Sequence, residues 1–159
     1  MSGMPEHTAS AQDIDHVAAR LGSSLPSLAR ALERQVSRHY PHPKPPEAQL
    51  ALLRHVEEHD GVTVRAAAEA LLMKPNNVSA LVTQLTEQGL LQRRPDPSDK
   101  RVAHLHLTPA SRQALTEVEG LISAHLSRAL RALTDGELDA LGSALGALDS
   151  LDRHLSPRR

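Results

Sequence analysis

Apolar residues recur at every third or fourth position along most of the chain, and this spacing predicts a mainly helical protein. The first helical stripe runs from Ile14 to Val36 and contains Pro26, which is expected to kink or interrupt the helix. Residues 1–12 are small and polar without periodicity, which predicts a disordered N-terminus. Four prolines within 40–46 exclude a helix there, so a stiff connector is expected to follow the first helix.

The middle of the chain combines short helical patterns with one segment of strict alternation. Gly61 is suited to end the first of these helices, Thr63 to cap the second and Gly89 to end the third. The three helices are predicted at 47–59, 64–72 and 75–88. Residues 90–94 and 102–107 are expected to follow as the two strands of a hairpin.

The second strand of this hairpin is predicted to have one buried and one exposed face. The residues expected to face the core are Ala103, Leu105 and Leu107. The residues expected on the opposite face are Val102, His104 and His106. Two short helices joined by a tight turn and followed by a hairpin form a winged helix-turn-helix, here assigned to 47–108 as the DNA-binding domain.

Helices are also predicted on the C-terminal side of this module. Thr108 and Pro109 provide a cap and a first helical position for a helix to about Leu133, and 134–137 has the pattern of a capping box. The leucines expected along one face of the last helix are Leu138, Leu141, Leu145, Leu148 and Leu151.

The predicted fold class is mainly α with a small two-stranded β wing. It is a winged helix-turn-helix with N- and C-terminal dimerisation helices, at 13–46 and 109–155. Two subunits that interlock both apolar stripes bury more surface than one chain can bury by itself, so an intertwined homodimer is expected.

Composition narrows the classes of function. The formal net charge is −1, but positive charge is concentrated at 61–107, where six Lys or Arg accompany four Asp or Glu. The chain has no cysteine, which excludes disulfides, thiolate chemistry and Cys-based metal sites. It has neither an apolar run long enough to cross a membrane nor a signal-peptide pattern, so a cytoplasmic protein without a membrane partner is expected. Tyr40 is the sole aromatic residue.

The predicted helix at 75–88 has an apolar face and, opposite it, an uncharged polar face. Short polar side chains surround Ala80 on the polar face, and such groups donate and accept hydrogen bonds at base edges. The residues predicted to contact a major groove are Asn76, Asn77, Ser79, Thr83 and Gln84. An ordinary solvated helix surface is the alternative interpretation of this face.

Basic residues surround that helix rather than lie on it, a placement that suits phosphate contacts. In the stretch RRPDPSDKRVAHLHLT at 93–108, a proline-stiffened loop precedes Arg101, which is predicted to enter a minor groove. Asp99 is expected to orient the Arg101 guanidinium through a charge-assisted hydrogen bond, and a turn with solvated charges is the alternative. The residues predicted to build the wing or to contact the DNA backbone are Thr63, Arg65, Lys74, Arg93, Arg94, Asp99, Lys100 and Arg101.

The segment 47–109 resembles the MarR family of transcriptional regulators. Its wing is similar to that family's Asp-Pro-x-Asp-Lys/Arg-Arg wing followed by Leu-Thr, and VSALVTQLTEQGLL at 78–91 resembles the family's recognition helix and its exit. By this resemblance, Asp99 and Arg101 match the wing's supporting acid and minor-groove arginine. The chain departs from the family where Ala80 replaces a frequent basic residue and where Lys74-Pro75 replaces the common cap, which leaves the helix start open between 74 and 77.

The resemblance implies a homodimer on double-stranded DNA, with recognition helices in successive major grooves and wings in the flanking minor grooves. A repressor at a palindromic operator is favoured over an activator, because steric occlusion needs no partner surface. The resemblance also implies, for many members, a small-molecule effector that weakens DNA binding. The corresponding pocket is expected near 36–55, where Tyr40 is the only aromatic side chain available to stack on a ring.

Ten histidines raise the alternative of a metal-responsive regulator. His55 and His59 are spaced i, i+4 and can ligate one Zn²⁺, but neither an HExxH pattern nor a carboxylate-rich constellation accompanies them. No metal and no cofactor are therefore predicted. His104 and His106 are interpreted as wing surface that gains charge near phosphate or at acidic pH.

An enzyme is not predicted, and no catalytic residue is assigned. The chain has neither a Gly-x-Ser-x-Gly elbow nor a Gly-rich phosphate loop. A winged-helix protein-interaction module is the remaining alternative, although it leaves the wing arginines without a selective role. Steep salt dependence of specific DNA binding distinguishes a DNA-binding regulator from such a module.

Overall fold

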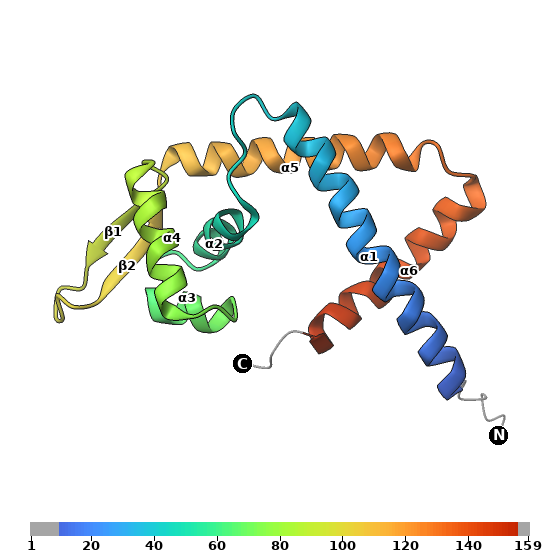
Figure 1. Ribbon diagram of the computed structural model, residues 1–159, viewed down its shortest axis with the longest axis horizontal. Coiled ribbons are helices and arrows are strands. Elements are labelled where there is room, and N and C mark those ends of the chain that lie inside the picture. Colours follow the sequence, from blue (N-terminus) through green and yellow to red (C-terminus); the bar gives the residue numbers. More distant parts are fainter. Residues whose placement is uncertain (1–9, 156–159) are drawn as a thin grey trace, which may run out of the picture.

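A computed structural model describes residues 10–155 and confirms the predicted fold class, six helices with one two-stranded antiparallel sheet. The elements are α1 (Ala11–His39), α2 (Glu47–Glu58), α3 (Val64–Ala70), α4 (Pro75–Glu87), β1 (Leu91–Pro95), β2 (Ala103–Leu107), α5 (Pro109–Leu130) and α6 (Asp135–Leu155). The winged-helix lobe of α2, α3, α4 and the hairpin lies at one end of α5, whereas α6 begins at the other end of α5 and turns back (Figure 1). α1 lies on the same side of α5 as α6 (Figure 1).

α1 begins earlier than predicted and is not broken by its proline. The Ser10 hydroxyl accepts a hydrogen bond from the Asp13 N–H at 3.2 Å, and the Asp13 carboxylate accepts one from the Ser10 N–H at 3.3 Å. This capping box starts the helix, so the prediction of disorder is wrong for residues 10–12, while residues 1–9 lie outside the described residues. The helix also continues through Pro26, because one lost hydrogen bond is a small part of a 29-residue helix.

The fully buried hydrophobic side chains in the core of the winged-helix lobe are all aliphatic. α2 lies at its centre, in contact with α3, α4, α5 and β2. The buried side chains of α2 that form this core are Leu50, Leu52, Leu53 and Val56. Those contributed by the elements around it are Ala67, Ala68, Val78, Val82, Leu85, Leu91, Leu105, Leu107, Leu115 and Val118. Each buried Leu or Val stabilises the fold by roughly 1.5–3 kcal/mol, and this packing fixes α4 relative to the hairpin.

The turn between α3 and α4 contains a leucine in the left-handed conformation. The Met73 N–H donates to the Ala68 carbonyl at 2.9 Å, and Leu72 between them adopts a φ of 53°. α4 ends in a similar turn, where the left-handed residue is Gly89 with a φ of 72°. Glycine adopts this conformation without steric cost, whereas leucine is strained in it, and the Leu72 side chain is 76% exposed.

Leu72→Gly is expected to raise the free energy of unfolding by about 0.5–1 kcal/mol. The left-handed strain of about 1–2 kcal/mol is relieved, and the greater freedom of glycine in the unfolded chain offsets only part of it. Urea or thermal unfolding measures the difference. Leu72→Ala is the matched control, because it shortens the exposed side chain but keeps Cβ and should not stabilise the protein. Equal stability of the two variants would show that Leu72 is unstrained.

β2 forms backbone hydrogen bonds along both of its edges. On one edge it pairs with β1 in an antiparallel register that sets Leu91 opposite Leu107. On the other edge, the Gly61 N–H donates to the Leu105 carbonyl and the Leu105 N–H donates to the Val62 carbonyl, both at 2.9 Å. The wing is therefore attached to the connector between α2 and α3 as well as to its own hairpin partner.

α5 and α6 begin with the predicted capping residues. Thr108 and Ser111 form a capping box with Pro109 at the first helical position, and Thr134 and Glu137 bond reciprocally at the start of α6. α6 has no buried residue within the described chain. Its most exposed leucines are Leu138, Leu141, Leu145, Leu151 and Leu155.

α1 carries a similar uncovered apolar stripe. Of its residues, only Val36 is buried within the described chain. The exposed large apolar residues of α1 are Ile14, Val17, Leu25 and Leu28. None of the helices described is long and apolar enough to cross a membrane.

Candidate nucleic-acid interface

α4 presents its uncharged polar face to solvent. Lys74 is the cap residue and Pro75 occupies the first helical position, so the helix starts at the early end of the range that the sequence left open. Val78, Val82 and Leu85 are buried and hold the helix on the core. The five residues predicted to contact a major groove are all exposed: Asn76, Asn77, Ser79, Thr83 and Gln84.

Two of these polar residues are held by neighbouring side chains. The Thr83 hydroxyl donates to the Ser79 carbonyl at 3.0 Å and accepts from the Arg93 Nη2 at 3.4 Å. Gln84 Oε1 accepts from Nε2 of Gln49, a buried residue of α2 that the sequence did not identify, at 3.2 Å. This bond uses one lone pair of the Gln84 oxygen and leaves both amide N–H groups to donate, which suits contacts with phosphate or guanine.

Arg93 and Arg94 lie on opposite faces of the hairpin. Residues directly opposite each other in an antiparallel pair share a face, so Arg93 lies with Leu105 and Arg94 with His104. Arg93 therefore approaches α4, in agreement with its contact to Thr83, whereas Arg94 projects from the other face. The sequence had grouped these two arginines as similar backbone contacts, and the structure separates them.

The remaining predicted backbone contacts lie on α3 and at the start of α4. Thr63 caps α3, because its hydroxyl accepts from the Ala66 N–H at 3.2 Å. Arg65 Nε lies 3.1 Å from the Glu69 carboxylate, but both side chains are exposed. Such a surface pair contributes little stability and leaves Arg65 able to turn towards phosphate. Lys74 is exposed as well.

Asp96, a residue that the sequence did not single out, organises the wing tip. Its Oδ1 accepts from the Ser98 N–H at 2.8 Å, the Ser98 hydroxyl at 2.5 Å and the Asp99 N–H at 3.1 Å. Its Oδ2 lies 2.9 Å from Nε2 of His104. An aspartate followed by backbone donors two and three residues later is an Asx turn, and this signature is readable in Asp-Pro-Ser-Asp. The conformation of the loop is thus fixed by hydrogen bonds to the Asp96 carboxylate as well as by its prolines.

Asp99 shapes the backbone at Arg101 rather than holding its guanidinium. Asp99 Oδ1 accepts from the Arg101 N–H at 2.9 Å. The expected hydrogen bond to the guanidinium is absent from the described residues, because the carboxylate is engaged with the turn itself. Lys100 and Arg101 are both exposed, so their charges project from a turn that Asp99 and Asp96 build.

His104 ties the wing tip to the connector between α2 and α3. Its Nδ1 lies 2.6 Å from the Gly61 carbonyl oxygen and its Nε2 2.9 Å from Asp96 Oδ2. Both partners only accept hydrogen bonds, so both ring nitrogens donate and the imidazole is positively charged in this arrangement. The bond to Asp96, and secondarily the bond to Gly61, raise the pKa of His104 above its usual 6.5. The bond from His104, and then those from the Ser98 hydroxyl and backbone, hold the pKa of Asp96 well below 3.8.

The other histidine on this face is also engaged by an acid. His106 Nδ1 lies 2.9 Å from Asp60 Oδ1. The interpretation of His104 and His106 as wing surface awaiting phosphate is therefore incomplete. Both attach β2 to the connector that follows α2, through Gly61 and Asp60.

The anchor between His104 and Asp96 is expected to be strongest from about pH 4 to about pH 6.5. Because folding raises the pKa of His104, its contribution to stability is complete below its pKa in the unfolded chain and is lost as pH rises through its pKa in the folded protein. Because folding lowers the pKa of Asp96, its contribution is complete above its pKa in the unfolded chain and is lost as pH falls through its pKa in the folded protein. NMR titration should show His104 titrating above 6.5, with the Ser98 and Asp99 amide signals following it. In Asp96→Asn the pKa of His104 should fall back towards 6.5, and an unchanged pKa would exclude the ion pair.

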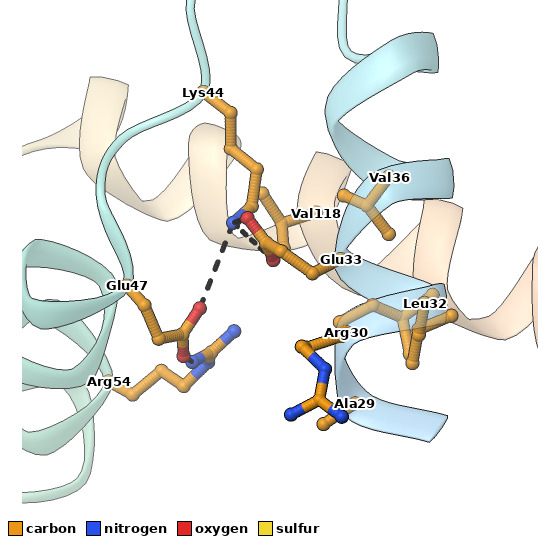
Figure 2. A pocket seen from close by; sticks show the side chains of 10 residues that line it. Ala29, Arg30, Leu32, Glu33, Val36, Lys44, Glu47, Arg54 and Val118 are labelled. Atoms are coloured by element: carbon orange, nitrogen blue, oxygen red, sulfur yellow. Dashed lines mark hydrogen bonds and ion pairs between the residues drawn. The ribbon is translucent and has the colours of Figure 1, made fainter. Parts of the chain in front are cut away.

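A cavity of about 480 Å³ lies beside the lobe, between α1, α2, α5 and the segment 40–46 that joins α1 to α2 (Figure 2). Lys44 Nζ lies 2.7 Å from Glu33 Oε1 and 3.7 Å from Glu47 Oε2, and Arg54 pairs with Glu47 at 2.9 Å. The hydrogen bond from Lys44 lowers the pKa of Glu33. Arg30 reaches along the α1 side of the cavity and forms no ion pair within the described chain (Figure 2). The apolar lining residues are Ala29, Leu32, Val36, Val118 and Ile122.

Tyr40 does not line this cavity, although it lies in the expected part of the chain. Its ring packs against the core, and burial and the Glu117 carboxylate raise the pKa of its hydroxyl. The expectation that Tyr40 is available to stack on a bound ring is therefore wrong for the cavity described.

The sequence is similar to known regulators. Residues 45–102 match the model of the MarR family. A putative transcriptional regulatory protein for the hcr operon of Thauera aromatica is 30% identical over 102 residues, 64% of this chain and 60% of that protein. The HTH-type transcriptional repressor MdtR of Bacillus subtilis (strain 168) is 31% identical over 91 residues, 57% of this chain and 59% of that protein. The chain thus spans about 60% of the length of these relatives.

The structural similarity includes the flanking helices. A putative transcriptional regulator from Pseudomonas aeruginosa PA01 superposes with a TM-score of 0.76 at 27% identity, over 91% of this chain and 98% of that one. The relatives are regulators and not enzymes, in agreement with the sequence prediction. Together with the exposed α4 face and the ordered wing, these similarities identify residues 45–102 as a winged-helix module of the MarR family of transcriptional regulators.

Proposed function

We propose that the protein represses transcription as a homodimer that binds double-stranded DNA at a palindromic operator. The observation that carries this proposal is the presence, on one lobe, of an exposed uncharged helix face and a wing with an ordered cationic tip. Asn76, Asn77 and Ser79 of α4 would read base edges in the major groove. Arg101 would enter the minor groove, and the other basic side chains would contact phosphates.

α1 and α6 are proposed to form the dimer interface. Both helices leave apolar side chains uncovered within the described chain, and both lie outside the winged-helix lobe (Figure 1). A second copy that covers these stripes removes them from water, which favours association. To bind successive major grooves on one side of DNA, this arrangement would have to set the two α4 helices about 34 Å apart.

Repression is proposed as the direction of regulation. A dimer bound over a promoter excludes other proteins by steric occlusion and needs no activating surface. The relative MdtR is described as a repressor, which supports this direction.

The cavity beside the lobe is proposed to bind a small organic anion that weakens DNA binding. Its walls are mostly apolar, and Arg30 is a cation without an ion-pair partner in the described chain. Lys44 and Arg54 are already neutralised by Glu33 and Glu47, so Arg30 is the charge most available to a carboxylate. A ligand between α1 and α2 would change how the lobe sits on the dimerisation helices.

Selection of bound sequences from a random duplex pool tests the DNA-binding proposal. We expect a palindromic motif whose affinity falls steeply with salt and survives excess random competitor. Benzoate added to the complex tests release by an organic anion, and the Arg30→Gln variant should resist it. A folded dimer that enriches no sequence would support the protein-interaction module instead.

A further inference from the structure

The C-terminal end of α2 gathers three potential metal ligands on one side of the helix. His55, Glu58 and His59 are spaced i, i+3 and i+4, and one ligand atom from each lies within 4.8 Å of the others. The imidazole rings are stacked, with centroids 4.5 Å apart and planes inclined by 30°. The sequence had shown the histidine pair without an accompanying carboxylate, and the structure adds Glu58 as the third group.

The surroundings of the two histidines favour metal binding. His59 Nδ1 lies 3.2 Å from the His55 carbonyl oxygen and donates to it, so a metal would be bonded through Nε2. His55 is only 9% exposed and its ring is held by packing, whereas Glu58 is exposed and free to rotate. The end of a helix carries partial negative charge on its last carbonyl groups, which further favours a cation there.

The geometry suits a small divalent ion of intermediate softness. Zinc bonds imidazole nitrogen and carboxylate oxygen at about 2.0–2.2 Å, which sets tetrahedral ligands roughly 3.4 Å apart. The separation of up to 4.8 Å in this cluster therefore requires a closure of up to about 1.4 Å. Rotation of the exposed Glu58 side chain, together with a turn of the His59 imidazole out of the stacked arrangement, would supply it without moving α2. Calcium and magnesium prefer sets made wholly of oxygen ligands and are disfavoured by two imidazoles.

We propose that His55, Glu58 and His59 bind one zinc ion, with a fourth position open to water. This site is separate from the proposed DNA contacts and does not depend on them. Gly61, two residues beyond His59, bonds to β2 through its N–H and to His104 through its carbonyl. Zinc would therefore hold the end of α2 and steady the connector to which the wing is attached.

Isothermal titration of Zn²⁺ into the metal-free full chain, made without a histidine tag, tests the proposal. One ion per chain is expected, and Co²⁺ in its place should give the visible absorption of a tetrahedral site. His59→Gln should abolish this binding, and Glu58→Gln should weaken it by about 10-fold or more. Glu57→Gln, which removes the neighbouring exposed carboxylate, is the matched control and should bind as the wild type does.

Two further readouts distinguish a zinc site from adventitious binding by histidines. Zinc should raise the Tm of the wild type and of Glu57→Gln but not of His59→Gln. It should also slow amide exchange in β2, whether or not DNA binds. Binding that persists in His59→Gln, or a stoichiometry well below one per chain, would overturn the proposal.

Discussion

Replacing Leu141 and Leu145 together by glutamate is expected to produce a folded monomer that binds operator at least about 100-fold more weakly than the wild type. These side chains are 46% and 59% exposed in the single chain and belong to the uncovered leucine row of α6. Two carboxylates in that row would have to be buried without partners on association, which opposes dimerisation. A monomer engages one half-site, so the advantage of two linked contacts is lost.

The monomer should remain folded, because nearly all of the buried core belongs to α2, α3, α4, the hairpin and the first half of α5. Circular dichroism checks the fold, light scattering the mass, and a shift assay the affinity. Ser143→Glu adds one negative charge, half of that in the double variant, at an exposed position on the opposite side of α6 and should leave all three unchanged. A double variant that stays dimeric would place the subunit interface elsewhere.

Arg101→Ala is expected to weaken operator binding by about 1–3 kcal/mol, a factor of roughly 5 to 150 in Kd. The Arg101 N–H that bonds to Asp99 is retained in alanine, so the turn should persist and only the projecting guanidinium is removed. The loss should be largest for operators with A·T-rich flanks, where the minor groove is narrow and its negative potential is high.

Shift assays at physiological salt, on operators with A·T-rich and G·C-rich flanks, measure this effect. Arg131→Ala removes an exposed arginine at the end of α5, far along the chain from the wing, and should not change affinity. Arg101→Lys keeps the charge without the planar fork and should recover part of the binding. If alanine at 101 leaves Kd unchanged on both operators, the arginine does not contact the groove.

The elements whose signals are local could be predicted from the sequence. The three helices of the lobe follow from apolar spacing and from Gly61, Thr63 and Gly89 at their ends, and the structure confirms each within a few residues. The exposed face of α4 follows from the same periodicity. The start of α1 was missed although Ser10 and Asp13 have the spacing of a capping box, because the first residues lack apolar periodicity. The predicted break at Pro26 does not occur, because the local preference of one proline is outweighed by the long helix around it.

Contacts between residues far apart in the chain could not be predicted from the sequence. The bond between Gln49 and Gln84 joins residues 35 positions apart and depends on how α2 crosses α4. The bond between His104 and Asp96 depends on the hairpin register and on the proximity of Gly61, which no pattern states. The assignment of Asp99 to the Arg101 guanidinium failed for the same reason, since the choice between a side-chain and a backbone partner is made by turn geometry.

The closed turn at Asp96 also bears on the thermodynamics of complex formation. A wing tip that already has four hydrogen bonds to one carboxylate loses little conformational entropy when DNA arrives. Association at this site then resembles rigid docking, with a modest heat-capacity change, rather than folding coupled to binding. Variation in affinity among operators should accordingly arise from the cost of deforming each DNA sequence around a fixed protein surface.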